Sequence, residues 1–451
     1  MHSLPPTDVA GLAERALTDA LADAIREYTA RNPASRALFE RAQRVMPGGN
    51  TRTAIFFEPF PLYIPEGAGA YIVDADGHRY LDVLGEYTAG LFGHSERRIL
   101  DAAFAAAAHG VSNGGPNVHE IELAELLCAR FPSLAQVRFC NSGTEANLYA
   151  LSLARVVTGR SRFLCFQGAY HGGVFVFAQG GSPINAPFEW IIGPYNDAER
   201  TVSSIRAVGA DLAGVIMEPM LTNAGCIPAT KEFISVVREE CSRSGAALIF
   251  DEVVTSRHGE GGLQGLLGVR PDLTTFGKYI GGGFSFGAFG GRAQYMARMD
   301  PRRADAIPHA GTFNNNVFSM SAGAMALRSV YTAERAQALF QSGESLLNRL
   351  NELCRRTTTA VQFTGMGSTI NVHFHRGVIH APEDLAREPK GLITLFHFDL
   401  LAQGIYAARR GQLNLSLPMG QEEEESICQA VRAFLNRRIA LIEAVTPSVG
   451  G

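Results

Sequence analysis

The sequence predicts an α/β protein with a mostly parallel central sheet in a large domain and a smaller α+β domain beside it. Two observations lead to this fold class. The chain has 451 residues, which is beyond the size at which a single hydrophobic core usually stops growing. After about residue 90, helical stretches alternate with short apolar runs, and such runs are typical of strands buried on both faces of a parallel sheet.

The change in pattern divides the chain into three regions. Residues 1–85 are expected to form an N-terminal segment that belongs to the small domain. Residues 86–335 are expected to form the large domain, and residues 336–451 the C-terminal part of the small domain. The sequence contains no internal repeat and no linker, so the two domains should share a broad interface.

The N-terminal region is predicted to combine helix with a β-hairpin. Residues 1–46 carry apolar side chains at helical spacing until Pro47-Gly48-Gly49-Asn50 breaks the pattern. Farther on, Tyr71–Val73 and Tyr80–Val83 flank Asp76-Gly77, which is a hairpin signal.

Short apolar runs mark the strands expected in the rest of the chain. Those of the central sheet are Val137–Cys140, Arg162–Phe166, Gly214–Met217 and Ala246–Phe250. In the C-terminal region, Thr369–Phe374 and Leu413–Leu417 are strand-like. Sites in α/β proteins lie at the carboxyl ends of the strands, so polar residues that directly follow these runs are candidate site residues.

Charge, cysteine spacing and the distribution of apolar and histidine residues argue against a nucleic-acid-binding protein, a membrane or secreted protein, and a metal site. The formal net charge of -4 argues against a nucleic-acid-binding protein, which normally carries a basic stripe. Scattered cysteines without a CxxC pair, together with the lack of a signal-peptide pattern or a membrane-spanning apolar stretch, favour a cytoplasmic protein with no membrane partner. No metal site is predicted, because His373 and His375 share one face of a strand but lack a third ligand.

The first chemical signal is a strand end that leads into a helix at residues 139–146, Phe-Cys-Asn-Ser-Gly-Thr-Glu-Ala. Backbone N–H groups at a helix N-terminus form an anion site, and Ser142 and Thr144 add hydroxyl groups. An ordinary N-cap followed by Glu145 is the alternative interpretation, and the pattern alone does not decide between the two.

Two further strand ends carry groups suited to a planar heterocycle. Tyr170, in a glycine-rich loop, can stack on such a ring, although a structural tyrosine is more common at such positions. Asp251 follows five apolar residues, and its carboxylate can bind a cationic ring nitrogen; Val253 points the same way. The acid pair of a nucleotide hydrolase is the alternative, but the only Gly-Lys dipeptide, Gly277-Lys278, lacks the Walker A context.

Lys278 lies between apolar and glycine residues in Phe276–Gly283, which is an unusual setting for a surface charge. Burial lowers the pKa of a lysine and makes it nucleophilic toward aldehydes. The neighbouring glycines permit close approach of a ligand to the backbone. A dinucleotide-binding loop at Gly281–Gly291 is not favoured, because this stretch does not connect a strand to a helix in the required way.

These motifs occur together in one order, and the chain resembles the class III aminotransferases of fold type I, which use pyridoxal 5'-phosphate (PLP). Within that class it is most similar to the branch that holds glutamate-1-semialdehyde aminomutase and the β-phenylalanine aminotransferases. The matching residues are Met46–Arg52, Asn141–Ala146, Tyr170-His171-Gly172, Asp251-Glu252-Val253 and Gly311-Thr312-Phe313. The resemblance covers nearly the whole chain and implies the PLP-dependent transferase fold type I.

The resemblance also implies how the chain would hold the cofactor ring. Lys278 would attach PLP covalently, and Asp251 would bind its pyridinium nitrogen. Tyr170 would stack on one ring face and Val253 would pack against the other. Glu218, in Met217-Glu218-Pro219, is similar to the family's strand-end glutamate near the cofactor.

For the cofactor phosphate, the resemblance implies a site shared between two subunits. Ser142, Gly143 and Thr144 would bind the phosphate of their own subunit's cofactor. Thr312 would bind the same phosphate from the partner subunit, so the active unit would be a homodimer.

The implied activity is transfer of the amino group of a β-amino acid, aromatic and β-phenylalanine-like, to 2-oxoglutarate or pyruvate. The main alternative is an isomerase of the glutamate-1-semialdehyde aminomutase type. Aminomutases usually continue the Gly-Thr motif with Gly-Asn-Pro, whereas Phe313-Asn314-Asn315-Asn316 stands here. Thr255–His258 also departs from the Thr-Gly-Phe stretch of many relatives. A PLP-binding protein without activity is disfavoured, because Lys278 and Asp251 are both present.

Two arginines are candidates for binding substrate carboxylates, because a guanidinium group binds a carboxylate through two hydrogen bonds. Arg52 precedes an apolar stretch, and Arg410 precedes the strand-like Leu413–Leu417. Ordinary salt bridges are the alternative for each. Arg409 is a rival for Arg410, since adjacent residues of an extended segment face opposite ways. The resemblance to the β-phenylalanine aminotransferases favours Arg52 and Arg410.

Overall fold

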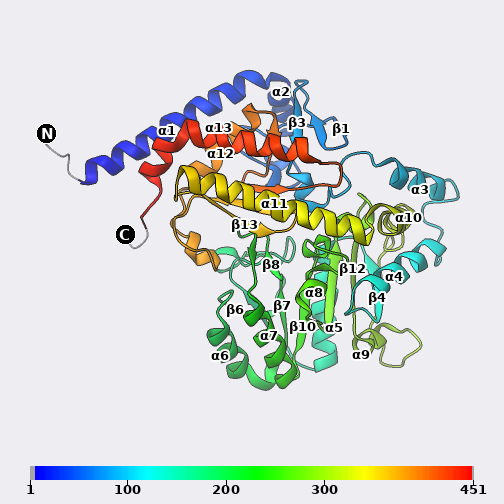
Figure 1. The fold of residues 1–451 in the computed structure, drawn as a ribbon. Helices are drawn as coiled ribbons and strands as arrows, with labels where there is room; N and C mark the ends of the chain where they lie inside the picture. The colour runs from blue at the N-terminus through cyan, green and yellow to red at the C-terminus, as the bar shows by residue number, and fades with distance from the viewer. Residues whose placement is uncertain (1–5, 449–451) are drawn as a thin grey trace.

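The computed structural model describes residues 6–448, in which a seven-stranded sheet lies below several long helices and smaller sheets (Figure 1). The strands follow one another across the sheet as β4 (Gln136–Cys140), β12 (Gly287–Gly291), β11 (Leu273–Gly277), β10 (Ala247–Asp251), β7 (Leu212–Met217), β5 (Arg162–Phe166) and β6 (Glu189–Gly193). Neighbouring strands pair in parallel except at β12, which is antiparallel to both β11 and β4. The predicted α/β fold class is confirmed.

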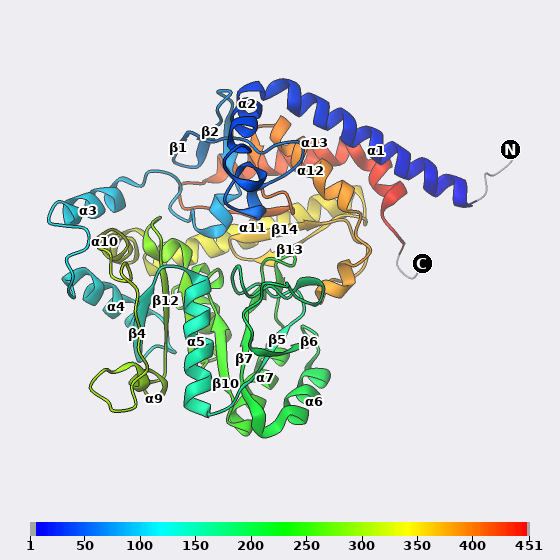
Figure 2. The ribbon, with the colours of Figure 1, turned by 180° about the vertical axis from the view of Figure 1, so that it is seen from behind.

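Helices cover both faces of this sheet. Helix α5 (Gly143–Thr158) lies in front of it in Figure 2, and α7 (Lys231–Ser244) lies on the other face, with α6 (Ala198–Val208) packed on α7. The hydroxyl of Ser142 caps α5 by accepting a hydrogen bond from Glu145 N (3.1 Å), and Gly159 ends the helix with a φ of 69°. These caps fix where the loops between strands and helices begin.

The four predicted strands of the central sheet are present as β4, β5, β7 and β10, within two residues of the expected ends. Strand β12 was not predicted, because Gly-Ala-Phe-Gly-Gly lacks the side chains that favour strands. Its glycines are required by packing instead: a Cβ at Gly287 would collide with Ser142 O, and one at Gly291 with Asp272 O. The composition of this strand therefore reflects contacts with distant residues.

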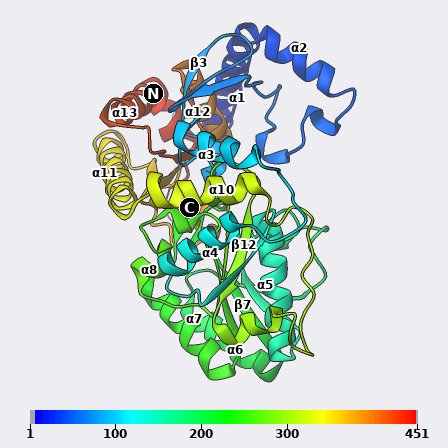
Figure 3. The same cartoon turned by 90° about the vertical axis from the view of Figure 1, so that its right-hand side faces the viewer.

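Two smaller sheets lie above the large one, and Figure 3 shows strand β3 of one of them above β7 and β12 of the large sheet. One contains β1 (Glu66–Ala68), β2 (Tyr71–Val73), β3 (Arg79–Asp82) and β15 (Ile405–Tyr406), and the other contains β13 (Gln362–Met366), β14 (Thr369–His373) and β16 (Gln412–Asn414). The predicted hairpin is confirmed as β2 and β3, and β15 pairs in parallel with β3. The N-terminal and C-terminal regions thus share one sheet, while the predicted domain boundaries at 85/86 and 335/336 stay predictions.

Two strand predictions for the C-terminal region have different outcomes. Thr369–Phe374 corresponds to β14, but the strand expected at Leu413–Leu417 is shorter, because β16 ends at Asn414. Beyond that point, Leu417 N donates to Leu91 O (2.8 Å), so the chain leaves the sheet to reach the segment before α3 (Arg97–Ala107).

The remaining long helices pack around the small sheets. They are α1 (Pro6–Arg31), α2 (Pro33–Ala42), α11 (Ala333–Thr357), α12 (Lys390–Ala402) and α13 (Gln421–Val445). The helix predicted over residues 1–46 is two helices in the described part of the chain, since Pro33 cannot donate a hydrogen bond and starts a new helix; residues 1–5 lie outside the described residues. None of the helices within residues 6–448 is long and apolar enough to cross a bilayer.

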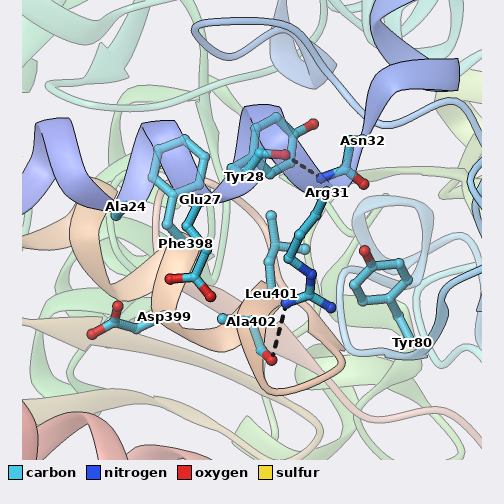
Figure 4. A pocket seen from close by; sticks show the side chains of 10 residues that line it. All are labelled: Ala24, Glu27, Tyr28, Arg31, Asn32, Tyr80, Phe398, Asp399, Leu401 and Ala402. Carbon is cyan, nitrogen blue, oxygen red and sulfur yellow. Dashed lines mark hydrogen bonds between the residues drawn. The ribbon is translucent and has the colours of Figure 1, made fainter.

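Helix α1 meets α12 at the contact drawn in Figure 4. There Arg31 Nη1 donates to Ala402 O (3.5 Å), and Asn32 Nδ2 donates to Tyr28 O (2.7 Å). The depression between these side chains has a volume of about 20 Å³, which is close to that needed for one water molecule. It is a packing gap between helices and too small for a substrate.

Candidate active site

A cleft of about 930 Å³ lies at the carboxyl ends of the central strands, a size suited to a cofactor together with a small substrate. It is lined by nine residues predicted from the sequence: Arg52, Gly143, Thr144, Tyr170, Glu218, Asp251, Val253, Lys278 and Arg410. Arg409 also lines it, whereas Ser142 and Thr312 do not. Residues separated by most of the chain length therefore meet in one cavity.

The wall formed by the start of α5 offers hydrogen-bond donors to an anion. The first backbone bond of this helix runs from Ala146 N to Ser142 O (3.0 Å), so the N–H groups of Gly143 and Thr144 precede the helical ladder. The Ser142 hydroxyl is engaged as the N-cap, which was the alternative interpretation of this residue. Its predicted contact with a phosphate stays a prediction.

Close packing around the helix start requires glycine at two positions. A Cβ at Gly143 would lie 2.8 Å from Val253 Cγ2, so Val253 packs directly against the start of α5. A Cβ at Gly172 would collide with the Thr144 hydroxyl, which instead accepts a hydrogen bond from Gly173 N (3.2 Å). These contacts hold the Tyr170 loop beside the helix start.

Asp251 ends β10 as a buried carboxylate whose orientation is fixed by three donors. Asn147 Nδ2 and His171 Nδ1 both lie 2.8 Å from its Oδ2, and Val253 N donates to its Oδ1 (3.0 Å). Asn147 is itself oriented, because its Oδ1 accepts from Thr275 Oγ1 (2.6 Å). The arrangement presents an acceptor of fixed direction, as a protonated ring nitrogen requires.

The roles of Asn147 and His171 were not predicted from the sequence. Asn147 lies four residues after Gly143 and so shares its face of α5, which was a usable signal. His171 directly follows Tyr170 in a recognised motif, yet nothing local indicated that its ring would reach Asp251, 80 positions away. Both side chains are buried and position Asp251.

Glu218 follows β7 and positions the loop that carries Tyr170. Its carboxylate accepts hydrogen bonds from Tyr170 N (3.0 Å) and from Thr222 Oγ1 (2.6 Å). Burial raises the pKa of Glu218 above its usual range. The Tyr170 side chain itself lines the cleft and the residue is 43% exposed, as expected for an aromatic ring available for stacking.

Lys278 directly follows β11, with a left-handed φ of 53° that is uncommon for a lysine. Its Nζ donates to Tyr87 O (2.5 Å), and no carboxylate forms an ion pair with it among the residues that the structure describes. Burial and then the nearby charge of Arg410 lower the pKa of Lys278 to about 8. A larger share of this amine is therefore neutral and nucleophilic near neutral pH than in an ordinary lysine.

Arg410 is enclosed by neutral groups. Its guanidinium donates to Asn223 Oδ1 (2.7 Å) and to Gln412 Oε1 (3.0 Å from Nε), and it lies 4.7 Å from the centre of the Tyr87 ring. It forms no ion pair within residues 6–448, and burial lowers its pKa. The neighbouring Arg409 is exposed. Arg410 thus has the setting of a receptor for an external carboxylate, since its charge lacks a partner.

Thr312 lies at the surface, in the turn that leads to α10 (Val317–Met325). Asn314 in the same turn accepts a hydrogen bond from Asn141 Nδ2 (2.9 Å), and Asn315 O accepts one from Asn117 Nδ2 (2.9 Å). The turn is therefore tied to the strand end before α5. Thr312 does not reach the cleft of its own chain, and its contact with a partner's phosphate stays a prediction.

The chemistry of this donor set fits PLP, the cofactor implied by the resemblance. The start of α5 would hold the phosphate, and the Asp251 carboxylate the ring nitrogen. Tyr170 and Val253 would contact the ring, and Lys278 supplies an amine for the aldehyde. Gly143 and Gly172 let Val253 and Thr144 lie directly against the backbone at this site.

Comparisons with known proteins agree with this chemistry. The Aminotransferase class-III family matches residues 57–417. The chain is 48% identical over 431 residues to the β-phenylalanine transaminase of Variovorax paradoxus, covering 96% of this chain and 99% of that protein. It is 34% identical to a glutamate-1-semialdehyde 2,1-aminomutase of Sorangium cellulosum, covering 89% of this chain and 95% of that protein.

Solved structures give the same result. The β-phenylalanine aminotransferase from Variovorax paradoxus superposes with a TM-score of 0.93 at 48% identity, covering 94% of this chain and 99% of that chain. An ω-transaminase from Sphaerobacter thermophilus superposes with a TM-score of 0.84 at 39% identity, covering 89% and 97%. The similarity extends over the whole fold and not over the central sheet alone.

Proposed function

The chain belongs to the class III aminotransferases, which depend on PLP, and from this premise we propose that its amino donor is a β-amino acid with an aryl group. The acceptor in this proposal is 2-oxoglutarate or pyruvate. The observation that carries the proposal is the enclosed Arg410, whose guanidinium has only neutral partners. The 48% identity to a protein named β-phenylalanine transaminase supports the same donor.

The cleft has room for the apolar group of such a donor. Its walls include the apolar residues Ala54, Phe56, Ala89, Val176, Val254 and Ile393. An aryl group can pack against these side chains while the carboxylate of the same donor binds Arg410. The enclosed Arg410 cation suits the carboxylate of a β-aryl-β-amino acid, and the apolar wall suits its aryl group.

Each site residue has a distinct task in the proposed reaction. Bound PLP supplies a sink for the electron pair left at the substrate carbon. Asp251, oriented by Asn147 and His171, keeps the proton on the ring nitrogen, so that the ring can accept this charge. The Lys278 Nζ, once the donor's amine has displaced it from the cofactor aldehyde carbon, would take up the proton lost by the substrate carbon and would return it to that cofactor carbon. Arg410 holds the substrate carboxylate and so orients the carbon that reacts.

Replacing Arg410 by alanine tests the substrate assignment. Loss of a buried, charge-assisted carboxylate contact is expected to cost about 2–4 kcal/mol in transition-state binding. The measurement is kcat/KM for a β-aryl-β-amino acid with 2-oxoglutarate or pyruvate as acceptor.

Arg409→Ala is the matched control, because this adjacent arginine lines the same cleft but is exposed. It should retain kcat/KM within about threefold of the wild type. Equal losses in both variants would contradict the assignment to Arg410.

An assay without a keto acid distinguishes the proposed transaminase from the aminomutase alternative, because only the transaminase needs an external acceptor. If the enzyme converted glutamate-1-semialdehyde without an acceptor and converted no β-amino acid, the aminomutase activity would take the place of the proposed function.

A homodimer with shared active sites is the second part of the proposal. Four exposed apolar residues support it: Phe104 on α3 (Arg97–Ala107), Val118 and Ile121 on α4 (Val118–Arg130), and Phe313 beside Thr312. Helices α3, α4 and α10 lie toward the viewer on one side of the molecule in Figure 3. Exposed apolar groups gathered near one side of a protein mark an interaction surface.

Placing a charge on this surface is expected to disrupt the dimer. Phe313→Asp should shift the sedimentation coefficient from dimer toward monomer and reduce activity at dilute protein concentration, because a buried unpaired carboxylate destabilises an interface. Val378→Asp, which changes an exposed apolar residue in the C-terminal region, should leave the dimer intact. A wild-type chain that sediments as an active monomer contradicts the shared site.

A further inference from the structure

The turn at residues 85–88 has an unusual backbone. The φ angles are 49° at Glu86, 50° at Tyr87 and 80° at Thr88, so three consecutive residues other than glycine lie in the left-handed region. Such a conformation is costly and persists only where neighbouring contacts enforce it. Here Gly85 N donates to Asp82 Oδ1 (2.9 Å) at the start of the turn. Strain of this kind concentrates at functional sites.

The turn faces three cations of the cleft at once. The Glu86 carboxylate forms an ion pair with Arg52, and the Tyr87 ring lies 4.7 Å from the guanidinium of Arg410. The Tyr87 carbonyl accepts the hydrogen bond from Lys278 Nζ (2.5 Å). The turn thus brings a carboxylate, a ring and a carbonyl from two adjacent residues to three separate cations.

Two of the three arginines that line the cleft, Arg52 and Arg410, differ in their partners. Arg410 is surrounded by neutral groups, so its charge is available to a ligand. The charge of Arg52 is instead neutralised by Glu86. The Arg52 and Glu86 side chains are 47% and 52% exposed, and an ion pair in such a position is weak and readily exchanged. A competing carboxylate can therefore take the place of Glu86.

We propose that Glu86 is the resting counter-ion of Arg52 and that the second carboxylate of a dicarboxylate acceptor displaces it. With an apolar donor in the cleft, the closed Arg52–Glu86 pair presents no net charge. With 2-oxoglutarate, Arg52 binds the distal carboxylate and Glu86 turns to solvent. Glu86 thus sets the balance between apolar and acidic substrates at one position. This inference rests on the proposed function for its substrates.

Binding of non-reacting acids to the Glu86→Gln holoenzyme tests the inference. Glutamine keeps the size of the side chain but removes the charge that competes for Arg52. Calorimetric titration with glutarate, a dicarboxylate without an amino or keto group, should show about three- to fivefold tighter binding than in the wild type. Butyrate, which has one carboxylate, should change by less than about twofold. Adding Arg52→Ala to Glu86→Gln should abolish the gain for glutarate.

Glu189→Gln is the matched control, because Glu189 pairs with Arg162 at similar exposure (59% and 48%) away from the cleft. It should leave both affinities unchanged. Unchanged glutarate binding in Glu86→Gln, or an equal gain for butyrate, overturns the inference.

In kinetics, Glu86→Gln should lower KM for 2-oxoglutarate but not for pyruvate. Because glutarate binding needs no turnover, failure to convert β-amino acids would contradict the proposed function alone.

Discussion

Replacing Lys278 by alanine is expected to lower kcat by about 10³-fold or more, since in the proposed function this one side chain both attaches the cofactor and carries the proton. The structure gives the amine the required properties. It lies at the end of a central strand, and burial together with the charge of Arg410 lowers its pKa to about 8. Steady-state kinetics of the PLP-loaded variant measures the loss.

Lys390→Ala is the matched control for this variant. Lys390 lines the same cleft but is exposed, at the start of α12. It should retain kcat within a few-fold of the wild type. If Lys278→Ala kept a tenth of the wild-type kcat, or if Lys390→Ala lost as much as Lys278→Ala, the assignment of the reactive amine would be wrong.

Asp251→Asn is expected to retain PLP and to lower kcat by about 10²- to 10⁴-fold. An amide has nearly the shape of a carboxylate but lacks the charge that keeps the ring nitrogen protonated. Its NH₂ group would also face a present donor in either orientation, either Asn147 and His171 on one side or Val253 N on the other. Absorbance of the bound cofactor measures retention, and single-turnover kinetics measures the chemical step.

Asp272→Asn separates this effect from a general loss of stability. Asp272 is also buried and forms ion pairs with Arg238 (2.8 Å) and Arg292 (3.0 Å), but it precedes β11 at the opposite end of that strand from Lys278. The substitution should lower the melting temperature without changing kcat. Turnover of Asp251→Asn within a few-fold of the wild type would remove Asp251 from its proposed role.

The strands and the ends that carry the site residues could be predicted from the sequence because their signals are local. An apolar run such as Ala246–Phe250 must be buried, and the polar residue that follows it must lie at the edge of the sheet. Strand β12 was not predicted, because its glycines are required by close contact with the backbone oxygens of Ser142 and Asp272. These two residues are not its neighbours in the sequence.

The partners that orient the predicted residues depend on similarly long-range contacts. Asn147 lies 104 positions from Asp251, and Asn223 lies 187 positions from Arg410. No pattern of spacing links such pairs before the fold is known. Gln412, two residues after Arg410, and Val253, two residues after Asp251, were close enough in sequence to be considered.

The choice between Arg409 and Arg410 shows what structure adds to a resemblance. On the sequence alone, either residue could face the cleft, because alternation along an extended segment does not reveal its register. In the fold, Arg410 is held by Asn223 and Gln412 and stacks on Tyr87, while Arg409 is exposed. The contacts of Arg410 make it the better candidate for a substrate carboxylate.

The identity of the lysine that carries PLP tests the assigned active site directly. The chain contains three lysines, Lys231, Lys278 and Lys390. Borohydride reduces the C=N bond between an amine and the cofactor aldehyde and so fixes the cofactor on its lysine. Mass spectrometry of peptides from the reduced holoenzyme should find the label on Lys278 alone. A label on Lys231 or Lys390, with Lys278 unmodified, would contradict the assignment of Lys278 as the lysine that holds the cofactor.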